Sequence, residues 1–144
     1  MLCEGPRELS VKRIVFVCVE NSNRSQMAEA FARIYGAGKV EAHSAGSRPS
    51  GQVNPKAIAA MQELGYDLSR HASKGLEFFN GQEFDAAVTM GCGDTCPFVL
   101  AQQRFEWTIP DPREMTPDQF REVRDLIGHK VRELIESLCP PTDP

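Results

Sequence analysis

Two reactive side chains, Cys18 and Arg24, are separated by five residues in a short polar segment. A cysteine thiolate is a strong nucleophile, and a guanidinium holds two oxygens of a tetrahedral anion through its planar fork. Backbone N–H groups of the residues between them can surround the same anion. The spacing therefore predicts a covalent reaction of Cys18 with an oxyanion that Arg24 holds. The alternative is a buried strand cysteine beside a surface arginine.

The elements expected around this segment favour the catalytic interpretation. Residues 13–19 form a short β-branched apolar run, which predicts a buried parallel strand. Apolar residues at helical spacing predict a helix over residues 25–35. The segment thus joins a strand to a helix N-terminus, where the helix dipole attracts anions and favours the thiolate of Cys18. We expect Ser25 to donate a hydrogen bond to that thiolate and the amide of Asn21 to brace the loop.

A second pair of thiols, Cys92 and Cys96, follows a strand predicted at residues 85–90. A cysteine pair this close is redox-active or metal-binding in a reducing compartment. Zinc needs about four ligands, and we expect no metal site because the histidines lie in other predicted elements: His43, His71 and His129. Cys3 and Cys139 lie in terminal segments, and we expect no role for them.

Strand and helix patterns alternate along the whole chain. Further strands are expected at residues 40–45 and 104–109, a second helix at 54–64, and a last helix from Thr116 or Asp118 to Leu138. This alternation predicts an α/β fold with a parallel sheet. In such sheets ligands bind beyond the carboxyl ends of the strands, where the segment carrying Cys18 begins. We expect residues 1–12 to form an N-terminal tail and residues 13–140 a single catalytic domain.

Composition excludes several classes of function. The chain has 144 residues and a net charge of -4, which argues against a nucleic-acid or anionic-membrane partner. No apolar run approaches the roughly 20 residues of a membrane span, and the first residues lack a signal-peptide core. The odd number of cysteines, 5, argues against structural disulfides. We therefore expect a cytoplasmic monomer.

Residues 17–30, VCVENSNRSQMAEA, resemble the active-site signature of arsenate reductases built on the low-molecular-weight tyrosine phosphatase fold. Further segments agree in order with the second strand, the second helix, the general-acid loop and the last helix of that family: 43–46, 53–58, Asp111-Pro112 and 120–125. The resemblance spans residues 13–138. It implies a three-layer α/β fold with a central, mostly parallel four-stranded sheet flanked by helices.

The resemblance also implies a role for each matching residue. Cys18 would be the nucleophile, Arg24 the oxyanion clamp and Asp111 the general acid. The oxyanion-binding loop would comprise Glu20, Asn21, Ser22, Asn23, Arg24 and Ser25. In thioredoxin-coupled members a second cysteine attacks the nucleophile and a third attacks the second. Here Cys92 would attack Cys18, and Cys96 would then attack Cys92.

Some members of the family bind potassium beside the loop. Asn21, Glu29 and Ser44 match the first three ligands, but Lys74 stands where the fourth ligand, an Asp, is expected. We hypothesise that the ammonium group of Lys74 substitutes for the cation. No bound cofactor is expected beyond an external thiol reductant.

Other departures from the family pattern leave questions open. Asn23 stands where a second loop cysteine is frequent, and Glu20 where glycine is common. A carboxylate there disfavours anion binding unless it points away or pairs with a base. The spacing from Cys92 to Cys96 is shorter than in the best-known thioredoxin-coupled members, so the donor is open: thioredoxin, glutaredoxin with glutathione, or mycothiol.

Three functions compete. The first is reduction of arsenate to arsenite through a Cys18 adduct that Cys92 and Cys96 resolve. The second is a low-molecular-weight tyrosine phosphatase acting on phosphate monoesters, but Arg113-Glu-Met115 follows Asp111-Pro112 where family phosphatases carry aromatic residues. The third is a non-enzymatic protein that binds oxyanions or a redox partner, against which the complete Cys, Arg and Asp set argues.

Overall fold

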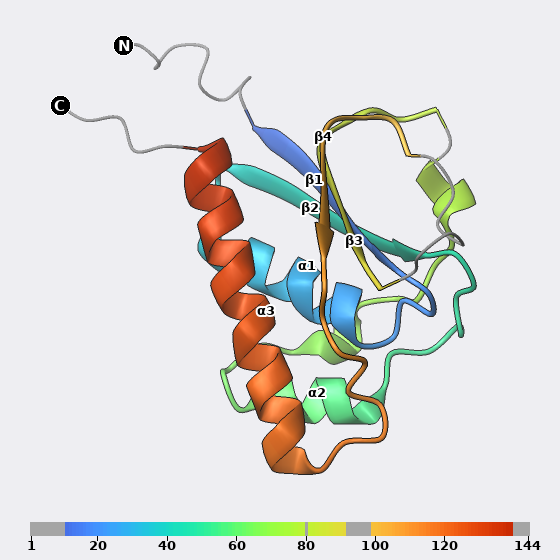
Figure 1. The fold of residues 1–144 in the computed structure, drawn as a ribbon, viewed down its shortest axis with the longest axis vertical. Coiled ribbons are helices and arrows are strands. Elements are labelled where there is room, and N and C mark those ends of the chain that lie inside the picture. Colours follow the sequence, from blue (N-terminus) through green and yellow to red (C-terminus); the bar gives the residue numbers. More distant parts are fainter. Residues whose placement is uncertain (1–10, 80, 92–98, 140–144) are drawn as a thin grey trace, which may run out of the picture.

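The central element is a sheet of four parallel strands. The computed structural model describes residues 11–79, 81–91 and 99–139. The strands are β1 (Lys12–Cys18), β2 (Val40–Gly46), β3 (Phe84–Met90) and β4 (Ala101–Trp107), in the order β2-β1-β3-β4 (Figure 1). β1 and β3 are central, so their buried apolar runs match those predicted from the sequence.

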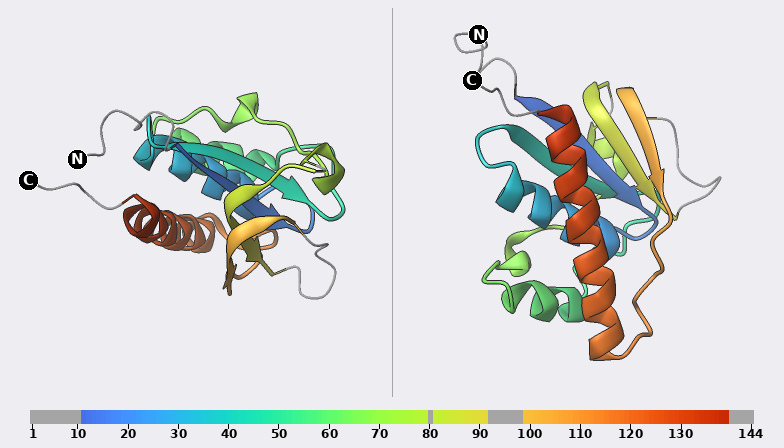
Figure 2. Two further views of the ribbon diagram at one scale, coloured as in Figure 1. Left: turned by 90° about the horizontal axis from the view of Figure 1, so that it is seen from above. Right: turned by 60° about the vertical axis from the view of Figure 1, so that its left-hand side comes forward.

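The described helices are α1 (Arg24–Tyr35), α2 (Pro55–Gln62) and α3 (Pro117–Leu138), with short 3₁₀ helices η2 (Leu68–Arg70) and η3 (Leu76–Phe79). α3 lies along α1, which packs on β1 and β2 (Figures 1 and 2). Asn54 caps α2 through its side chain, and Thr116 opens α3 with a capping box. None of the helices in the described ranges combines the length and apolarity that a membrane span requires.

Apolar clusters cover both faces of the sheet because successive strand residues point to opposite sides. Ile14 and Phe16 of β1 pack in one cluster with Met27 of α1 and Ile127 of α3. On the other face Val15 and Val17 pack in a smaller cluster with Phe79 of η3 and Phe84. The expected α/β fold with a four-stranded parallel sheet and flanking helices is confirmed.

The last strand lies earlier than expected. The sequence predicts it at residues 104–109, but β4 spans Ala101–Trp107. β4 is an edge strand, and its first half is the polar sequence Ala-Gln-Gln-Arg, which lies partly exposed. An edge strand needs no continuous apolar run because one side faces solvent, so hydrophobicity alone places its start too late.

Because every strand is parallel, the carboxyl ends meet at one edge of the sheet. Cys18 ends β1, Gly46 ends β2, and Gly91 follows β3. β1 and β2 are in register with Cys18 opposite Gly46. This edge therefore carries the segment with the predicted chemistry.

Candidate active site

The loop between β1 and α1 turns its carbonyl groups outward. The carbonyls of Val19, Glu20 and Ser22 accept hydrogen bonds from backbone N–H groups of residues 48–54 at 2.7, 3.0 and 3.0 Å. Within the described part of the chain, the backbone N–H groups of residues 20–23 donate no hydrogen bond to another backbone group. These donors, together with the N-terminus of α1, are available to an oxyanion.

Asn21 holds the shape of this loop. Its φ of 51° lies in the left-handed region, which asparagine tolerates better than most residues. Its Nδ2 donates to the hydroxyl of Ser25 at 2.8 Å, and its Oδ1 accepts from the backbone N–H of Lys74 and from Nε2 of Gln26, both at 2.9 Å. The side chain thus fixes the loop through contacts on several sides, as expected for a brace.

Cys18 lies on the floor of the site with 2% of its surface exposed. Its sulfur is 2.8 Å from the hydroxyl oxygen of Ser25. Because that oxygen accepts from Asn21, the Ser25 proton is free to point at the sulfur. This contact holds the sulfur against the first turn of α1.

Arg24 is buried at the start of α1, and its guanidinium is fixed between two strand ends. Nη1 donates to the carbonyl of Ile109 at 3.0 Å, and Nη2 lies 3.9 Å from Oδ2 of Asp111. Gly91 has a φ of 80°, and a Cβ there would meet Nη1 of Arg24. Its backbone conformation therefore favours glycine at position 91, and a larger residue there would displace the guanidinium of Arg24.

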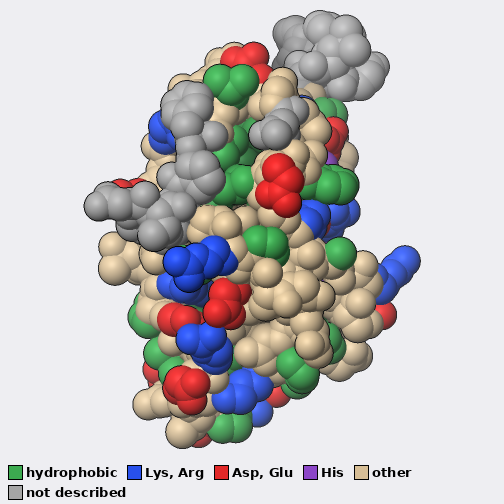
Figure 3. All heavy atoms as spheres, turned by 90° about the vertical axis from the view of Figure 1, so that its right-hand side faces the viewer, with side chains coloured by type: hydrophobic (Ala, Val, Ile, Leu, Met, Phe, Trp, Pro, Cys, Tyr) green, Lys and Arg blue, Asp and Glu red, His purple; other side chains and the backbone are tan. Residues whose placement is uncertain are grey.

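These residues surround one cavity of about 360 Å³. Its lining comprises Cys18, Val19, Glu20, Ser22, Asn23, Arg24, Gly91, Asp111 and Arg113. The structure thus brings Asp111, predicted as the general acid, into the cavity that holds Cys18 and Arg24. On the face shown in Figure 3, basic and acidic side chains are intermixed, so this face carries no broad patch of a single charge.

Glu20 pairs with a base that the sequence did not indicate. Its Oε2 accepts from Nη1 of Arg113 at 3.0 Å, and the backbone N–H of Arg113 donates to Oδ1 of Asp111 at 3.1 Å. The partners are 93 residues apart in sequence, so only the fold brings them together. The carboxylate is thereby neutralised at the anion site.

The remaining cysteines separate into two groups. Cys92 and Cys96, the predicted second and third thiols, lie outside the described residues, as does Cys3. Gly91, the residue immediately before Cys92, lines the Cys18 cavity. Cys139 lies half-buried after α3, beside the carbonyl of Lys39, and burial raises the pKa of its thiol.

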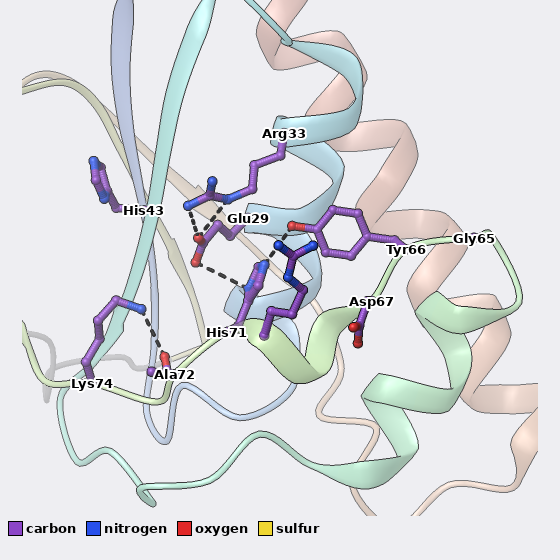
Figure 4. A pocket seen from close by; sticks show the side chains of 10 residues that line it. Glu29, Arg33, His43, Gly65, Tyr66, Asp67, His71, Ala72 and Lys74 are labelled. Atoms are coloured by element: carbon purple, nitrogen blue, oxygen red, sulfur yellow. Dashed lines mark hydrogen bonds and ion pairs between the residues drawn. The ribbon is translucent and has the colours of Figure 1, made fainter.

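A second cavity of about 620 Å³ contains Glu29 and Lys74 of the predicted cation site (Figure 4). Oε1 of Glu29 accepts from the Ser44 hydroxyl at 2.6 Å. Oε2 accepts from Nε and Nη2 of Arg33 at 3.0 and 2.7 Å. The ammonium of Lys74 instead donates to the Ala72 carbonyl at 2.9 Å. We did not predict Arg33 as the partner of Glu29 from the sequence, although an i,i+4 spacing of opposite charges is a recognisable pattern.

The ionisation of Lys74 is perturbed in this cavity. Burial lowers the pKa of its ammonium, and the nearby Glu29 carboxylate acts in the opposite direction. Among the described residues, no three His, Cys, Asp or Glu side chains converge as a metal site would require.

His71 connects the second cavity to the catalytic loop. Its Nδ1 lies 2.9 Å from Oε1 of Gln26, whose Nε2 donates to Asn21, and its Nε2 lies 2.7 Å from the Tyr66 hydroxyl (Figure 4). Burial lowers the pKa of His71, and Glu29, 3.7 Å away, only partly opposes this. A neutral ring that donates from Nδ1 and accepts at Nε2 satisfies both contacts.

Comparison with known proteins agrees with this geometry. The family model for low molecular weight phosphotyrosine protein phosphatases matches residues 13–140. The chain belongs to this family, which is the class that its fold and its site define. A glutaredoxin arsenate reductase of Synechocystis sp. is 40% identical over 131 residues, which cover 89% of this chain and 99% of that protein.

Solved structures give the same result. An arsenate reductase in its phosphate-binding state superposes with a TM-score of 0.81 at 39% identity, over 89% of this chain and 99% of that one. A thioredoxin-dependent arsenate reductase of Corynebacterium glutamicum gives a TM-score of 0.74 at 31% identity, over 89% of this chain and 62% of that one.

Proposed function

We propose that this protein is an enzyme that reduces arsenate to arsenite, with Cys18 as the nucleophile. The observation that carries the proposal is the position of Gly91. It lines the cavity above Cys18, and the next residue in the sequence is a second cysteine. The similarity to arsenate reductases supports the same conclusion.

In the first step the Cys18 thiolate attacks arsenic(V). A sulfur–arsenic bond forms, and one oxygen leaves as water after Asp111 supplies a proton. Arg24 and the inward N–H groups of the loop stabilise the negative oxygens through this step. The hydrogen bond from Ser25 holds the sulfur in position before the attack.

In the second step the Cys92 thiolate attacks the sulfur of Cys18. A disulfide forms, the electron pair of the sulfur–arsenic bond passes to arsenic, and arsenite leaves. Cys96 then attacks Cys92, which releases the Cys18 thiolate and leaves a Cys92–Cys96 disulfide. An external thiol donor reduces that disulfide. The relatives described above include a glutaredoxin arsenate reductase and a thioredoxin-dependent arsenate reductase, and either type of donor fits this chemistry.

A phosphatase acting on monoesters would use the same anion site without the second and third thiols. This alternative is not favoured, because the similar proteins at 31% to 40% identity described above are arsenate reductases. Water would hydrolyse a phosphocysteine, whereas arsenic(V) needs two electrons that only thiols supply here.

Replacing single cysteines tests the proposal. Cys92→Ser should abolish arsenate turnover while retaining hydrolysis of a small phosphate ester, because only the redox step requires that thiol. Cys18→Ser should abolish both activities. Cys139→Ser is the matched control, since this half-buried thiol lies beside Lys39 and outside the Cys18 cavity. Undiminished arsenate turnover by Cys92→Ser would contradict the relay.

A further inference from the structure

Two charged side chains from distant loops meet at the entrance of the Cys18 cavity. Glu20 follows β1, Arg113 follows β4, and their side chains form an ion pair at 3.0 Å. Both line the cavity, with 41% and 50% of their side chains exposed, whereas Cys18 is 2% exposed. The pair, which we call the bridge, therefore joins two loops in the more exposed part of the cavity, whereas the sulfur lies in its buried part.

Both ends of this bridge are anchored through their backbones. The carbonyl of Arg113 accepts from the ammonium of Lys56, in the first turn of α2, at 2.8 Å. The carbonyl of Glu20 accepts from the Ser50 N–H at 3.0 Å and from the Ser73 hydroxyl at 3.1 Å. The backbones that carry both side chains are therefore fixed on either side of the cavity, while the exposed ion pair itself contributes little to stability.

The bridge selects substrates by their size more than by their charge. Its two charges cancel, so Arg24 remains the cation available to an oxyanion on the cavity floor. Among the described residues, no aromatic side chain lines the cavity, and the apolar side chain of Val19 is the largest of its kind there. The exposed part of the cavity lining thus carries a guanidinium and a carboxylate, where a site for an aryl group would carry apolar side chains.

We propose that the Glu20–Arg113 ion pair restricts the Cys18 site to small inorganic oxyanions by closing the space that the aryl group of a phosphate ester needs. The inference rests on the proposed function and names its substrate class. A tetrahedral arsenate ion reaches Cys18 and Arg24 past the bridge. An aryl ester must break the bridge and leave both charges unpaired beside an apolar ring, which costs binding energy.

The test compares a variant that lacks the ion pair with the wild type, using p-nitrophenyl phosphate as the aryl ester. The double variant with Glu20→Ala and Arg113→Ala removes the bridge but retains the backbone N–H that holds Asp111. Its kcat/KM for the probe should rise about tenfold, the scale of a relieved steric exclusion in a pocket. The inhibition constant for inorganic phosphate is measured in the same variant. The gain in kcat/KM for the probe should exceed any change in this constant, because phosphate carries no aryl group to exclude.

The matched control exchanges the charges, with Glu20→Arg and Arg113→Glu, and so keeps a bridge across the entrance. It should exclude the aryl ester as the wild type does. An unchanged kcat/KM in the alanine variant, or an equal rise in the exchanged variant, would overturn the proposal. The double variant with Glu20→Ser and Arg113→Ser replaces the alanine variant if that protein proves unstable. It also removes both charges, so the same outcomes apply to it.

The measurements with p-nitrophenyl phosphate test this inference independently of the proposed function. Entry of the aryl ester is measured without arsenate or a thiol donor. A wild-type protein that never reduces arsenate would count against the function alone, while the ester measurements would still decide whether the ion pair excludes aryl groups.

Discussion

The hydroxyl oxygen of Ser25 lies 2.8 Å from the sulfur of Cys18, and it accepts a hydrogen bond from the Asn21 amide at the same distance. The amide thereby orients the hydroxyl proton toward the sulfur. Ser25 is fully buried, so no water replaces this donor without rearrangement. The nucleophile is therefore held by a side chain that is itself held by the loop.

Removing the hydroxyl should make Cys18 less reactive. Ser25→Ala is expected to slow alkylation of Cys18 by iodoacetamide at pH 7 by about tenfold or more, because a hydrogen bond to a charged group contributes about 1.5–3 kcal/mol. The rate is measured by mass spectrometry of the Cys18 peptide. Ser50→Ala, which removes a surface hydroxyl bonded to the Gln52 carbonyl, serves as the control. Equal rates in all three proteins would contradict the role of Ser25.

Gly91→Ala should weaken oxyanion binding by displacing Arg24. Gly38→Ala is a matched control, since Gly38 has a φ of 81° but no atom within 4 Å of the position that a Cβ would take, while a Cβ at Gly91 meets Nη1 of Arg24. Both substitutions should lower the free energy of unfolding by about 1–2 kcal/mol through backbone strain.

Only Gly91→Ala should raise the dissociation constant of inorganic phosphate, by about tenfold for one weakened charged contact. Calorimetric titration measures this constant, and phosphate binding does not require the neighbouring Cys92. If the two variants bind phosphate equally well, Gly91 does not position Arg24.

Protonation of His71 should destabilise the fold. Burial lowers the pKa of this imidazole below its ordinary 6.5, so the unfolded chain binds a proton at a higher pH than the folded chain does. The stability that the neutral ring contributes is therefore present above the unfolded pKa and is lost as the pH falls toward the folded pKa. The other charged and titratable groups that line the same cavity are Glu29, Arg33, His43, Tyr66, Asp67, Arg70 and Lys74.

Urea unfolding of the wild type and of His71→Gln at pH 7.5 and 5.0 measures this effect. The wild type should lose more stability on acidification than the variant, because the surrounding groups titrate in both proteins and their contribution cancels. Parallel losses would show that His71 does not become charged at a cost to the fold.

Potassium should have no effect on activity. Arg33 already neutralises the Glu29 carboxylate, and the ammonium of Lys74 lies at the Ala72 carbonyl in the same cavity. We propose that these two cations take the place of the potassium ion that the family resemblance leads us to expect beside Asn21, Glu29 and Ser44. Replacing potassium with sodium at constant ionic strength should leave the rate of arsenate reduction unchanged. A marked stimulation by potassium would refute this substitution.

Local patterns were sufficient to predict most of the sheet. The apolar, β-branched runs of β1 and β3 are continuous because both faces of these central strands are buried. The start of β4 was missed because an edge strand tolerates polar residues such as Gln102 and Gln103. The loop after Cys18 was placed correctly between a strand and a helix, since hydrophobic periodicity changes there.

The long-range contacts of the site could not be derived in this way. The partner of Glu20 is 93 residues away, and His71 is 45 residues from Gln26, so both contacts depend on how strands and loops assemble. The Glu29–Arg33 ion pair could have been predicted from the sequence, because the two residues lie one helical turn apart. The roles of Cys92 and Cys96 remain predictions.

One equivalent of arsenate added to the fully reduced protein, without any other donor, tests the central claim most directly. Disulfides are then mapped by peptide mass spectrometry, and released arsenite is quantified. The account predicts arsenite together with a Cys92–Cys96 disulfide and a free Cys18 thiol. Arsenate recovered unchanged, with no disulfide that involves Cys18, Cys92 or Cys96, would contradict it.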